Sequence, residues 1–205
     1  MLRLLIIRHG QTPYNLAARN QGHTDIELDE TGVAQAESLA HSLCQIDIDA
    51  IYSSDMKRAL RTAQTFSDRV GAEVLVDKRL RERNYGSWEG MTFEEIHKQD
   101  EEAYRRFRQD PVLYRSGGGE TGLEVFARVG AFLAELLRDR PAGSLAIFTH
   151  GGTGSAVIAA LLHGSPRTAA ALRLANCGIT EITIEENGRR RLVRLDDCSH
   201  LGTSC

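Results

Sequence analysis

The sequence predicts a layered α/β domain, and three observations lead to this fold class. Strand and helix patterns alternate along the 205 residues, as they do in domains that pack helices against a sheet. Hydrophobic residues make up 41% of the chain, which is enough for one sizeable core. No repeat, low-complexity segment or Pro/Gly/Ser-rich linker divides the chain, so we predict a single domain over residues 1–205.

The first half of the chain predicts three strands and two helices. The apolar run at residues 2–7 is typical of a strand that is covered on both faces. Shorter strands are expected at 49–53 and 73–76. Helices are expected at 29–44 and 56–70, because apolar residues recur there at helical spacing. The residues expected to face the core are Val33, Ala36, Ala40 and Leu43 in the first helix and Met56, Leu60, Ala63 and Val70 in the second.

The second half predicts two more helices, a strand and a hairpin. Thr121 and Glu124 fit a capping box that opens a helix. Its expected apolar face consists of Val125, Val129, Phe132 and Leu136. A strand at 144–148 leads through a glycine-rich turn into a helix at 155–163, which Gly164 and Pro166 would end.

Two further segments complete the expected domain. Asn187 and Gly188, between strands at 179–184 and 191–195, form the strongest short-range hairpin pattern. The segment at about 88–119 has helical patches but weak periodicity. We expect this segment to be an inserted lid.

Charge and composition narrow the classes of partner. The formal net charge is -3, whereas a nucleic-acid-binding domain needs a basic face. No apolar run approaches the ~18 residues of a membrane span, and the apolar N-terminal stretch is too short for a signal-peptide core. These features predict no nucleic-acid partner and no membrane. The oligomeric state is left open, with a homodimer among the choices.

The cysteines favour a reducing compartment. They form no CxxC pair and no zinc-like spacing with histidine. We therefore expect reduced thiols and a cytoplasmic location. The four cysteines are Cys44, Cys177, Cys198 and Cys205.

Two histidines occupy equivalent places at the ends of expected strands. His9 follows the strand at 2–7, His150 follows the strand at 144–148, and each is followed by glycine. Ligands of open α/β sheets bind at the carboxyl ends of the strands, so the two histidines are expected to converge on one ligand. The glycines would let a bulky anion approach the backbone.

Arginines and a glutamate complete a candidate anion site. Arg58 lies about one turn into the helix after the strand at 49–53, where it can point back over the helix N-terminus. Arg8 and Arg61 add positive charge near the histidines. Glu82 lies between two arginines, and a carboxylate beside a phosphate dianion takes up a proton more readily, which suits a general acid.

The motifs around these residues resemble those of the histidine phosphatase superfamily, the phosphoglycerate-mutase-like proteins. The similarity runs over the whole chain, and the family usually has serine in place of Thr121. The matching residues are Arg8-His9-Gly10-Gln11-Thr12 with Asn15, Gln21-Gly22-His23-Thr24-Asp25, Ser53-Ser54 with Arg58-Ala59, Glu82 with Gly86, Trp88, Glu89 and Gly90, Gly118-Gly119-Glu120-Thr121, and Thr149-His150-Gly151-Gly152.

The resemblance implies a three-layer α/β/α sandwich with a mostly parallel mixed sheet, and it implies residue roles. His9 would be the nucleophile that becomes phosphohistidine. Glu82 would protonate the leaving oxygen and then activate water. The phosphoryl oxygens would be bound by Arg8, Arg58 and His150. The phosphate and substrate pocket would be lined by Thr12, Asn15, Gln21, Gly22 and Gly151.

The superfamily includes phosphatases, mutases and non-catalytic members. The short chain and small lid favour a phosphatase that hydrolyses a small phosphorylated metabolite, over a cofactor-dependent phosphoglycerate mutase. A binding protein without turnover is disfavoured because the whole set of catalytic residues is present.

No metal and no cofactor is expected, since arginines supply the positive charge and no ligand cluster is left over. The arginines of the lid segment either form a solvated helix face or recognise a second anionic group on the substrate; they are Arg105, Arg106, Arg108 and Arg115.

Overall fold

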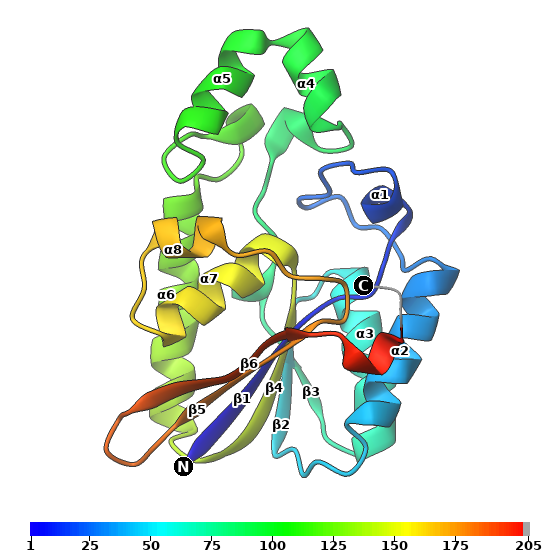
Figure 1. Cartoon of the computed structure of the whole chain (residues 1–205), viewed down its shortest axis with the longest axis vertical. Coiled ribbons are helices and arrows are strands. Elements are labelled where there is room, and N and C mark those ends of the chain that lie inside the picture. The colour runs from blue at the N-terminus through cyan, green and yellow to red at the C-terminus, as the bar shows by residue number, and fades with distance from the viewer. Residues whose placement is uncertain (203–205) are drawn as a thin grey trace.

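A computed structural model describes residues 1–202 and contains a six-stranded sheet between two layers of helices (Figure 1). The strand order is β3-β2-β4-β1-β5-β6. The first four strands along the chain pair in parallel, and the last two are antiparallel. This confirms the expected sandwich with a mostly parallel mixed sheet. The strands are β1 (Leu2–Arg8), β2 (Ala50–Ser53), β3 (Val74–Val76), β4 (Gly143–Thr149), β5 (Ile179–Ile184) and β6 (Arg190–Asp197).

The register of the two central strands determines where the site can form. β1 and β4 are parallel neighbours, and Arg8 pairs with Thr149 at their carboxyl ends. The next residues along the two strands are His9 and His150, so both histidines leave the sheet at the same level. The backbone N–H of His9 also donates to the carbonyl of Thr149 at 2.9 Å.

Alternate residues of β1 pack into different cores, as expected for a strand covered on both faces. Leu4 and Ile6 cluster with residues of α6 (Gly122–Asp139), α7 (Gly151–Leu161) and α8 (Pro166–Ala171). Leu5 and Ile7 cluster with residues of α2 (Glu30–Ser42) and α3 (Lys57–Val70). The sheet thus separates two hydrophobic cores. The short helix α1 (Pro13–Leu16) lies just beyond β1.

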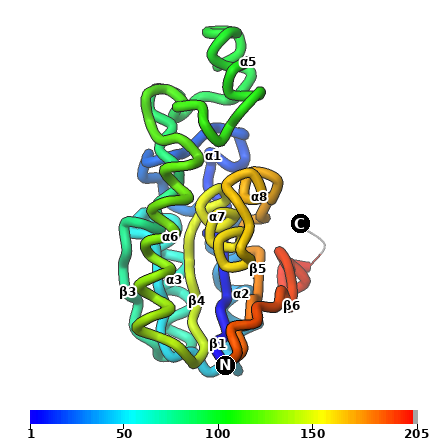
Figure 2. Tube along the Cα trace, turned by 90° about the vertical axis from the view of Figure 1, so that its left-hand side faces the viewer, coloured from blue at the N-terminus to red at the C-terminus, as the bar shows by residue number. Residues whose placement is uncertain are grey.

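The segment expected to be a lid extends beyond the carboxyl ends of the strands (Figures 1 and 2). It contains α4 (Phe93–Gln99) and α5 (Glu101–Gln109). Trp88, Ile96 and Phe107 form a small hydrophobic cluster of their own, separate from the two cores of the sheet. Four 3-10 helices complete the described structure: η1 (Lys78–Leu80), η2 (Gly86–Trp88), η3 (Ser116–Gly118) and η4 (Ser199–Leu201).

A narrow neck joins the lid to the sandwich, where the chain enters at Asn84 and returns at Glu120. The N–H of Glu120 donates to the carbonyl of Asn84 at 2.8 Å, and the N–H of Asn84 donates to Oε2 of Glu120 at 2.9 Å. The buried Arg83 guanidinium spans the same neck, with donors to the carbonyls of Glu120, Pro111 and Tyr114. These contacts hold the base of the lid in place.

Three details of the helices differ from the predictions. The α7 helix begins at Gly151 and not at 155, so the glycine-rich turn is its first helical turn. Pro166 does not end that helix but opens α8. The predicted inward face of α3 is also wrong in part, because Leu60 and Val70 are only half-buried while Arg58, Thr62 and Phe66 are buried. The polar members of that face are turned inward because they belong to the site.

Candidate active site

His9 is buried at the end of β1, and its ring is held by its own neighbour. The Nδ1 atom lies 2.6 Å from the carbonyl oxygen of Gly10, which can only accept, so Nδ1 carries the proton. The Nε2 atom is then the unprotonated nitrogen, and it has no hydrogen-bond partner among residues 1–202. Burial, together with the charges of Arg8 and Arg58, lowers the pKa of His9 well below its usual value of 6.5. The imidazole is therefore a neutral base near neutral pH.

His150 lies beside His9, with the ring centroids 5.1 Å apart, and both of its nitrogens have protein partners. Nε of Arg58 donates to Nδ1 of His150 at 3.2 Å. Nε2 of His150 therefore carries the proton and donates to Oγ of Ser54 at 2.9 Å. Burial and the nearby Arg58 lower the pKa of His150 well below 6.5. In this structure His150 positions Arg58 and holds Ser54.

Arg58 is fully buried, and its three guanidinium nitrogens all donate. Besides His150, it donates to the carbonyl of Thr24 at 2.9 Å and to that of Gly22 at 2.8 Å. Burial lowers the pKa of Arg58 to about 10, so the group is still charged at neutral pH. The expected orientation of Arg58 over the start of its helix is therefore produced by a loop and a histidine from other segments.

Arg8 brings a second positive charge to the same place. Its NH1 donates to the carbonyl of Leu174 at 2.6 Å, whereas its buried Nε has no hydrogen-bond partner. Burial lowers the pKa of Arg8, and the charge of Glu82 opposes that effect. Arg61, expected to add a third charge, is exposed on α3.

Backbone N–H groups in the first turn of α7 donate hydrogen bonds to the Glu82 carboxylate. Oε2 accepts from the N–H of Gly152 at 3.0 Å. Oε1 accepts from the N–H groups of Arg83 at 2.9 Å and Thr153 at 3.1 Å. The positive end of the helix thus holds the carboxylate beside the two histidines. Glu82 explains why α7 can begin directly after His150, since it satisfies N–H groups that a helix start leaves unpaired.

Protein groups cover the backbone at Gly10 and Gly152, whereas Gly151 lines the larger cavity. The expectation that an anion can approach these glycines is therefore wrong for Gly10 and stays a prediction for Gly151. A Cβ on Gly152 would lie 2.8 Å from Oε1 of Glu82. A Cβ on Gly151 would lie 3.6 Å from Nε of Arg8, in ordinary contact. Gly10 packs against the backbone of Gly32.

A cavity of about 130 Å³ lies between these groups. Arg8, Arg19, Arg58, His9 and Glu82 line it. Arg19 is paired with Glu95, so the positive charges of Arg8 and Arg58 face one carboxylate, and an anion would balance the charge. Of the residues predicted to bind substrate, Asn15 and Gln21 also line this cavity. Oε1 of Gln21 is buried without a hydrogen-bond partner.

The other predicted pocket residues have different positions. Thr12 caps α1, and its N–H donates to Oδ1 of Asn15 at 3.1 Å. Gly22 has a φ of 52° and offers its carbonyl to Arg58. Gly151 lines a second, larger cavity. Thr12 and Gly22 therefore do not line the smaller cavity but hold Asn15 and Arg58, which do.

The charged residues next to Glu82 in the sequence are engaged elsewhere. Arg81 pairs with Asp55, with Nε 2.6 Å from Oδ1, and Arg83 faces the neck of the lid. The Glu89 carboxylate accepts from the N–H of His23 at 2.8 Å and from the hydroxyl of Thr24 at 2.8 Å. Glu89 therefore joins two loops and does not line the smaller cavity.

The sequence did not single out four residues of the site, one of which, Arg19, lines the smaller cavity. Nδ2 of Asn176 donates to the carbonyl of His9 at 2.9 Å and to Oδ1 of Asn15 at 3.2 Å. Asn20 and Tyr85 line both cavities. Tyr85 lies inside the quoted motif region, whereas Asn176 follows no strand and no motif that would have marked it.

Within residues 1–202, no group of three or more His, Cys, Asp or Glu side chains is arranged to hold a metal ion. No helix in the same range is long and apolar enough to cross a bilayer. Cys44 and Cys177 form no disulfide, and Cys205 lies outside the described residues.

The fold and the site together define an enzyme of phosphoryl transfer: two histidines, two arginines and one carboxylate meet at the carboxyl edge of a mixed sheet. A model of the histidine phosphatase superfamily (branch 1) matches residues 4–197. The chain belongs to this superfamily.

Named relatives agree with this assignment. The chain is 39% identical over 168 residues to glucosyl-3-phosphoglycerate phosphatase of Mycobacterium tuberculosis, which covers 78% of this chain and 75% of the relative. It is 34% identical over 200 residues to a putative phosphoserine phosphatase 2 of Hydrogenobacter thermophilus, with 98% of both chains covered. A probable phosphoglycerate mutase of Shigella boydii also matches, at 34% identity over 188 residues, covering 91% of this chain and 87% of the relative.

A solved structure shows the same fold. The mycobacterial glucosyl-3-phosphoglycerate phosphatase in complex with VO3 superimposes with a TM-score of 0.85 at 34% identity. The match covers 95% of this chain and 98% of that one.

Proposed function

We propose that the enzyme hydrolyses phosphomonoesters of small metabolites in two steps, through a phosphohistidine on Nε2 of His9. The observation that carries the proposal is the hydrogen bond from Nδ1 of His9 to the carbonyl of Gly10. It leaves Nε2 as the unprotonated nitrogen in a ring that lines a cavity with two arginines. Relatives named as phosphatases support the same reaction class.

In the first step, Nε2 of His9 attacks phosphorus and the bond from phosphorus to the ester oxygen breaks. Glu82 gives a proton to the leaving oxygen, so that an alcohol departs. In the second step, water attacks phosphorus, Glu82 takes up one of its protons, and the N–P bond breaks to release phosphate. Arg8 and Arg58 stabilise the charge on the phosphoryl oxygens in both steps, and Nε2 of His150 exchanges Ser54 for one of these oxygens.

The proposed reaction is independent of metal, because the two guanidinium groups supply the positive charge that a phosphoryl group needs. Both are held by protein carbonyls, and the buried Nε–H of Arg8 has no partner among residues 1–202. We place the reaction in the cytoplasm, where thiols such as Cys44 and Cys177 remain reduced. Fractionation of cells that express the native gene tests this location.

Rapid quenching with a 32P-labelled phosphomonoester tests the intermediate. The wild-type enzyme should give an acid-labile, base-stable phosphoprotein, and His9→Ala should give none while it keeps the wild-type circular dichroism spectrum. Label on serine, or turnover by folded His9→Ala, would contradict the assignment.

A second candidate function is phosphoglycerate mutase activity, which one relative's name suggests. A mutase must keep water away from the phosphohistidine until the second acceptor oxygen is in place. The short lid favours hydrolysis, and the assay that separates the two is given in the Discussion.

A further inference from the structure

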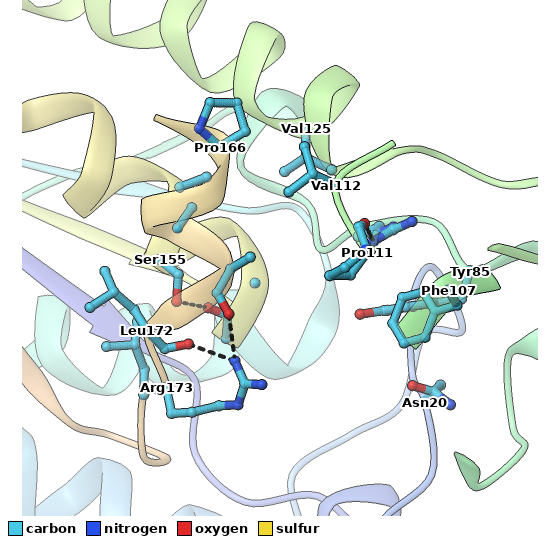
Figure 3. Close-up of a pocket in the computed structure, with 18 of the residues that line it drawn as sticks. Asn20, Tyr85, Phe107, Pro111, Val112, Val125, Ser155, Pro166, Leu172 and Arg173 are labelled. Carbon is cyan, nitrogen blue, oxygen red and sulfur yellow. Dashed lines mark hydrogen bonds between the residues drawn. The ribbon is translucent and has the colours of Figure 1, made fainter. Parts of the chain in front are cut away.

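A second cavity of about 490 Å³ adjoins the smaller one (Figure 3). Arg8, Asn20 and Tyr85 line both cavities. If the phosphoryl group occupies the smaller cavity, the rest of the substrate enters the larger one. The larger cavity is therefore the place where the enzyme can distinguish one leaving group from another.

Four distant parts of the chain form most of the wall of this larger cavity: the lid, the start of α6, the start of α7 and the segment from α8 to Leu174. Arg8 at the end of β1 and Asn20 in the loop after α1 complete the wall. In Figure 3, Tyr85 and Phe107 lie on the lid side, and Leu172 and Arg173 lie on the opposite side. Most of the wall is apolar, including Phe93, Phe107, Val112, Ala156 and Leu172.

The volume exceeds what a three-carbon leaving group needs. At the ~30 Å³ that one water molecule takes up in the liquid, a space of about 490 Å³ has room for roughly sixteen water-sized groups. Glycerate and serine have fewer than half that number of non-hydrogen atoms. The cavity instead lies within the range of about 300–1,000 Å³ that is usual for whole small-molecule ligands.

The charges on the cavity have one sign. Within residues 1–202, no Asp or Glu lines it, whereas four arginines do. Arg8 belongs to the phosphoryl site, and the donors of Arg83 are taken by carbonyls and by the hydroxyl of Ser116. Arg108 and Arg173 remain available at the exposed edge of the cavity.

These two arginines differ from their neighbours in the lid. In the described chain Arg108 has no hydrogen bond or ion pair, and Arg173 donates only to the carbonyls of Ala170 and Leu172. By contrast, Arg105 and Arg106 are both paired with Glu102 on the same helix. Arg115, the fourth arginine of that segment, is paired with Glu124. The structure thus divides the lid arginines into a solvated set and one residue that faces the cavity.

We propose that the larger cavity is a leaving-group subsite for a bulky, partly apolar alcohol that carries a carboxylate, and that Arg108 and Arg173 select the carboxylate. The proposal rests on the phosphatase activity proposed above. Arg173 comes from the α8 side and Arg108 from the lid, so the carboxylate would lie at the outer end of the leaving group. The apolar wall would contact the body of the alcohol, and Tyr85 would lie beside its ester oxygen.

A pair of phosphate esters that share the aryl phosphate and differ in whether the side group carries a charge tests the proposal. The first is 4-(carboxymethyl)phenyl phosphate, and the second is its methyl ester, in which the phenol is nearly the same leaving group. We expect the wild-type enzyme to prefer the carboxylate by about tenfold or more in kcat/KM, which is the effect of one or two charge-assisted hydrogen bonds at a partly exposed site. The preference should shrink in 0.5 M NaCl, because salt screens exposed charges.

Variants separate the two arginines from general effects on the chain. Arg108→Met and Arg173→Met should each reduce the preference several-fold, and the double variant should bring it close to one. Arg173→Lys should keep part of the preference, which shows that charge matters more than the contacts of Arg173 with α8. The matched control is Arg106→Met, on the same helix but paired with Glu102, and it should keep the wild-type preference.

The outcomes distinguish this proposal from the proposed function. If neither ester is hydrolysed, the phosphatase assignment itself fails. If both are hydrolysed at equal kcat/KM by the wild type, or if Arg106→Met changes the preference as much as Arg108→Met, the enzyme is a phosphatase but the subsite assignment is wrong.

Size is tested separately with Ala170→Leu. Ala170 is exposed and lines the cavity, so the substitution narrows the space without filling the core. It should reduce kcat/KM for the carboxymethylphenyl ester several-fold more than for ethyl phosphate. Equal losses for the two substrates would show that the larger cavity does not hold the leaving group.

Discussion

Replacing Glu82 with glutamine is the sharpest test of how the site works, because the structure lets its effects on stability and on rate be separated. The carboxylate accepts from three backbone N–H groups, those of Arg83, Gly152 and Thr153. In Glu82→Gln the amide oxygen can replace Oε1, but the amide nitrogen then faces the N–H of Gly152. The N–H of Gly152 loses its acceptor, at a cost of about 1 kcal/mol for a group that is not fully buried.

The expected loss of stability is therefore small, and the expected loss of rate is large. For a domain of this size, about 1 kcal/mol shifts Tm by roughly 2–4 °C, so the variant remains folded at 25 °C. Removal of a general acid lowers the rate of phosphorylation by about 10²–10⁴-fold for a poor leaving group. A good leaving group such as p-nitrophenolate needs little protonation and should lose much less.

The assay is single-turnover phosphorylation of His9, measured with p-nitrophenyl phosphate and with ethyl phosphate. Glu89→Gln is the matched control, because its carboxylate also joins loops near the site without lining the smaller cavity. It should lower Tm while leaving the ratio of the two rates unchanged. Equal losses for both substrates in Glu82→Gln would refute the role of Glu82 as the acid, and a changed ratio in Glu89→Gln would point to Glu89 instead.

Four further outcomes are expected. The pKa of His9 lies well below 6.5, so the imidazole is neutral and able to attack at any pH above that value. The acid limb of kcat/KM should therefore lie below pH 6.5, and a histidine limb at or above 6.5 in a pH–rate profile would contradict the burial argument. Unfolding also frees His9 and His150 to bind protons that they do not bind when folded, so the free energy of unfolding should fall as the pH drops below 6.5 in chemical denaturation. Hydrolysis should continue in excess EDTA, since Arg8 and Arg58 supply the positive charge; loss of activity that a single divalent metal restores would require a metal-dependent mechanism. With 3-phosphoglycerate and 2,3-bisphosphoglycerate together, released phosphate should exceed 2-phosphoglycerate, and rapid formation of 2-phosphoglycerate without phosphate release would identify a mutase.

Sequence patterns predicted the sheet and the convergence of His9 with His150 because both follow from local rules. Apolar runs mark buried strands, and parallel neighbours end at the same edge. The start of α7 was predicted four residues late because its first N–H groups are satisfied by Glu82, which is about 70 residues away in sequence. No local pattern around Gly151 contains that information.

The other parts of the site could not be predicted for the same reason: they depend on contacts between residues that are distant in sequence. Asn176 supports His9 through a hydrogen bond to its carbonyl, across 167 positions of the chain. The larger cavity has walls from several segments that are distant in sequence, and its volume depends on how the lid is placed over α7 and α8. Periodicity describes one element at a time, so contacts of this kind become visible only when the packing is known.

The neck at Asn84 and Glu120 has a consequence for how such an enzyme can diverge. The chain leaves the sandwich and returns to it through one pair of hydrogen-bonded residues, and the lid beyond them has its own small hydrophobic cluster. Within residues 1–202, the lid's other hydrogen bonds to the rest of the chain go to the loop after α1, to α6 and to α8, and not to the strands. The lid can therefore change in length, provided these contacts are kept, without repacking the strands that carry His9 and His150. Changes in the lid can alter the outer wall of the leaving-group cavity in this way, while the residues that line the smaller cavity stay the same.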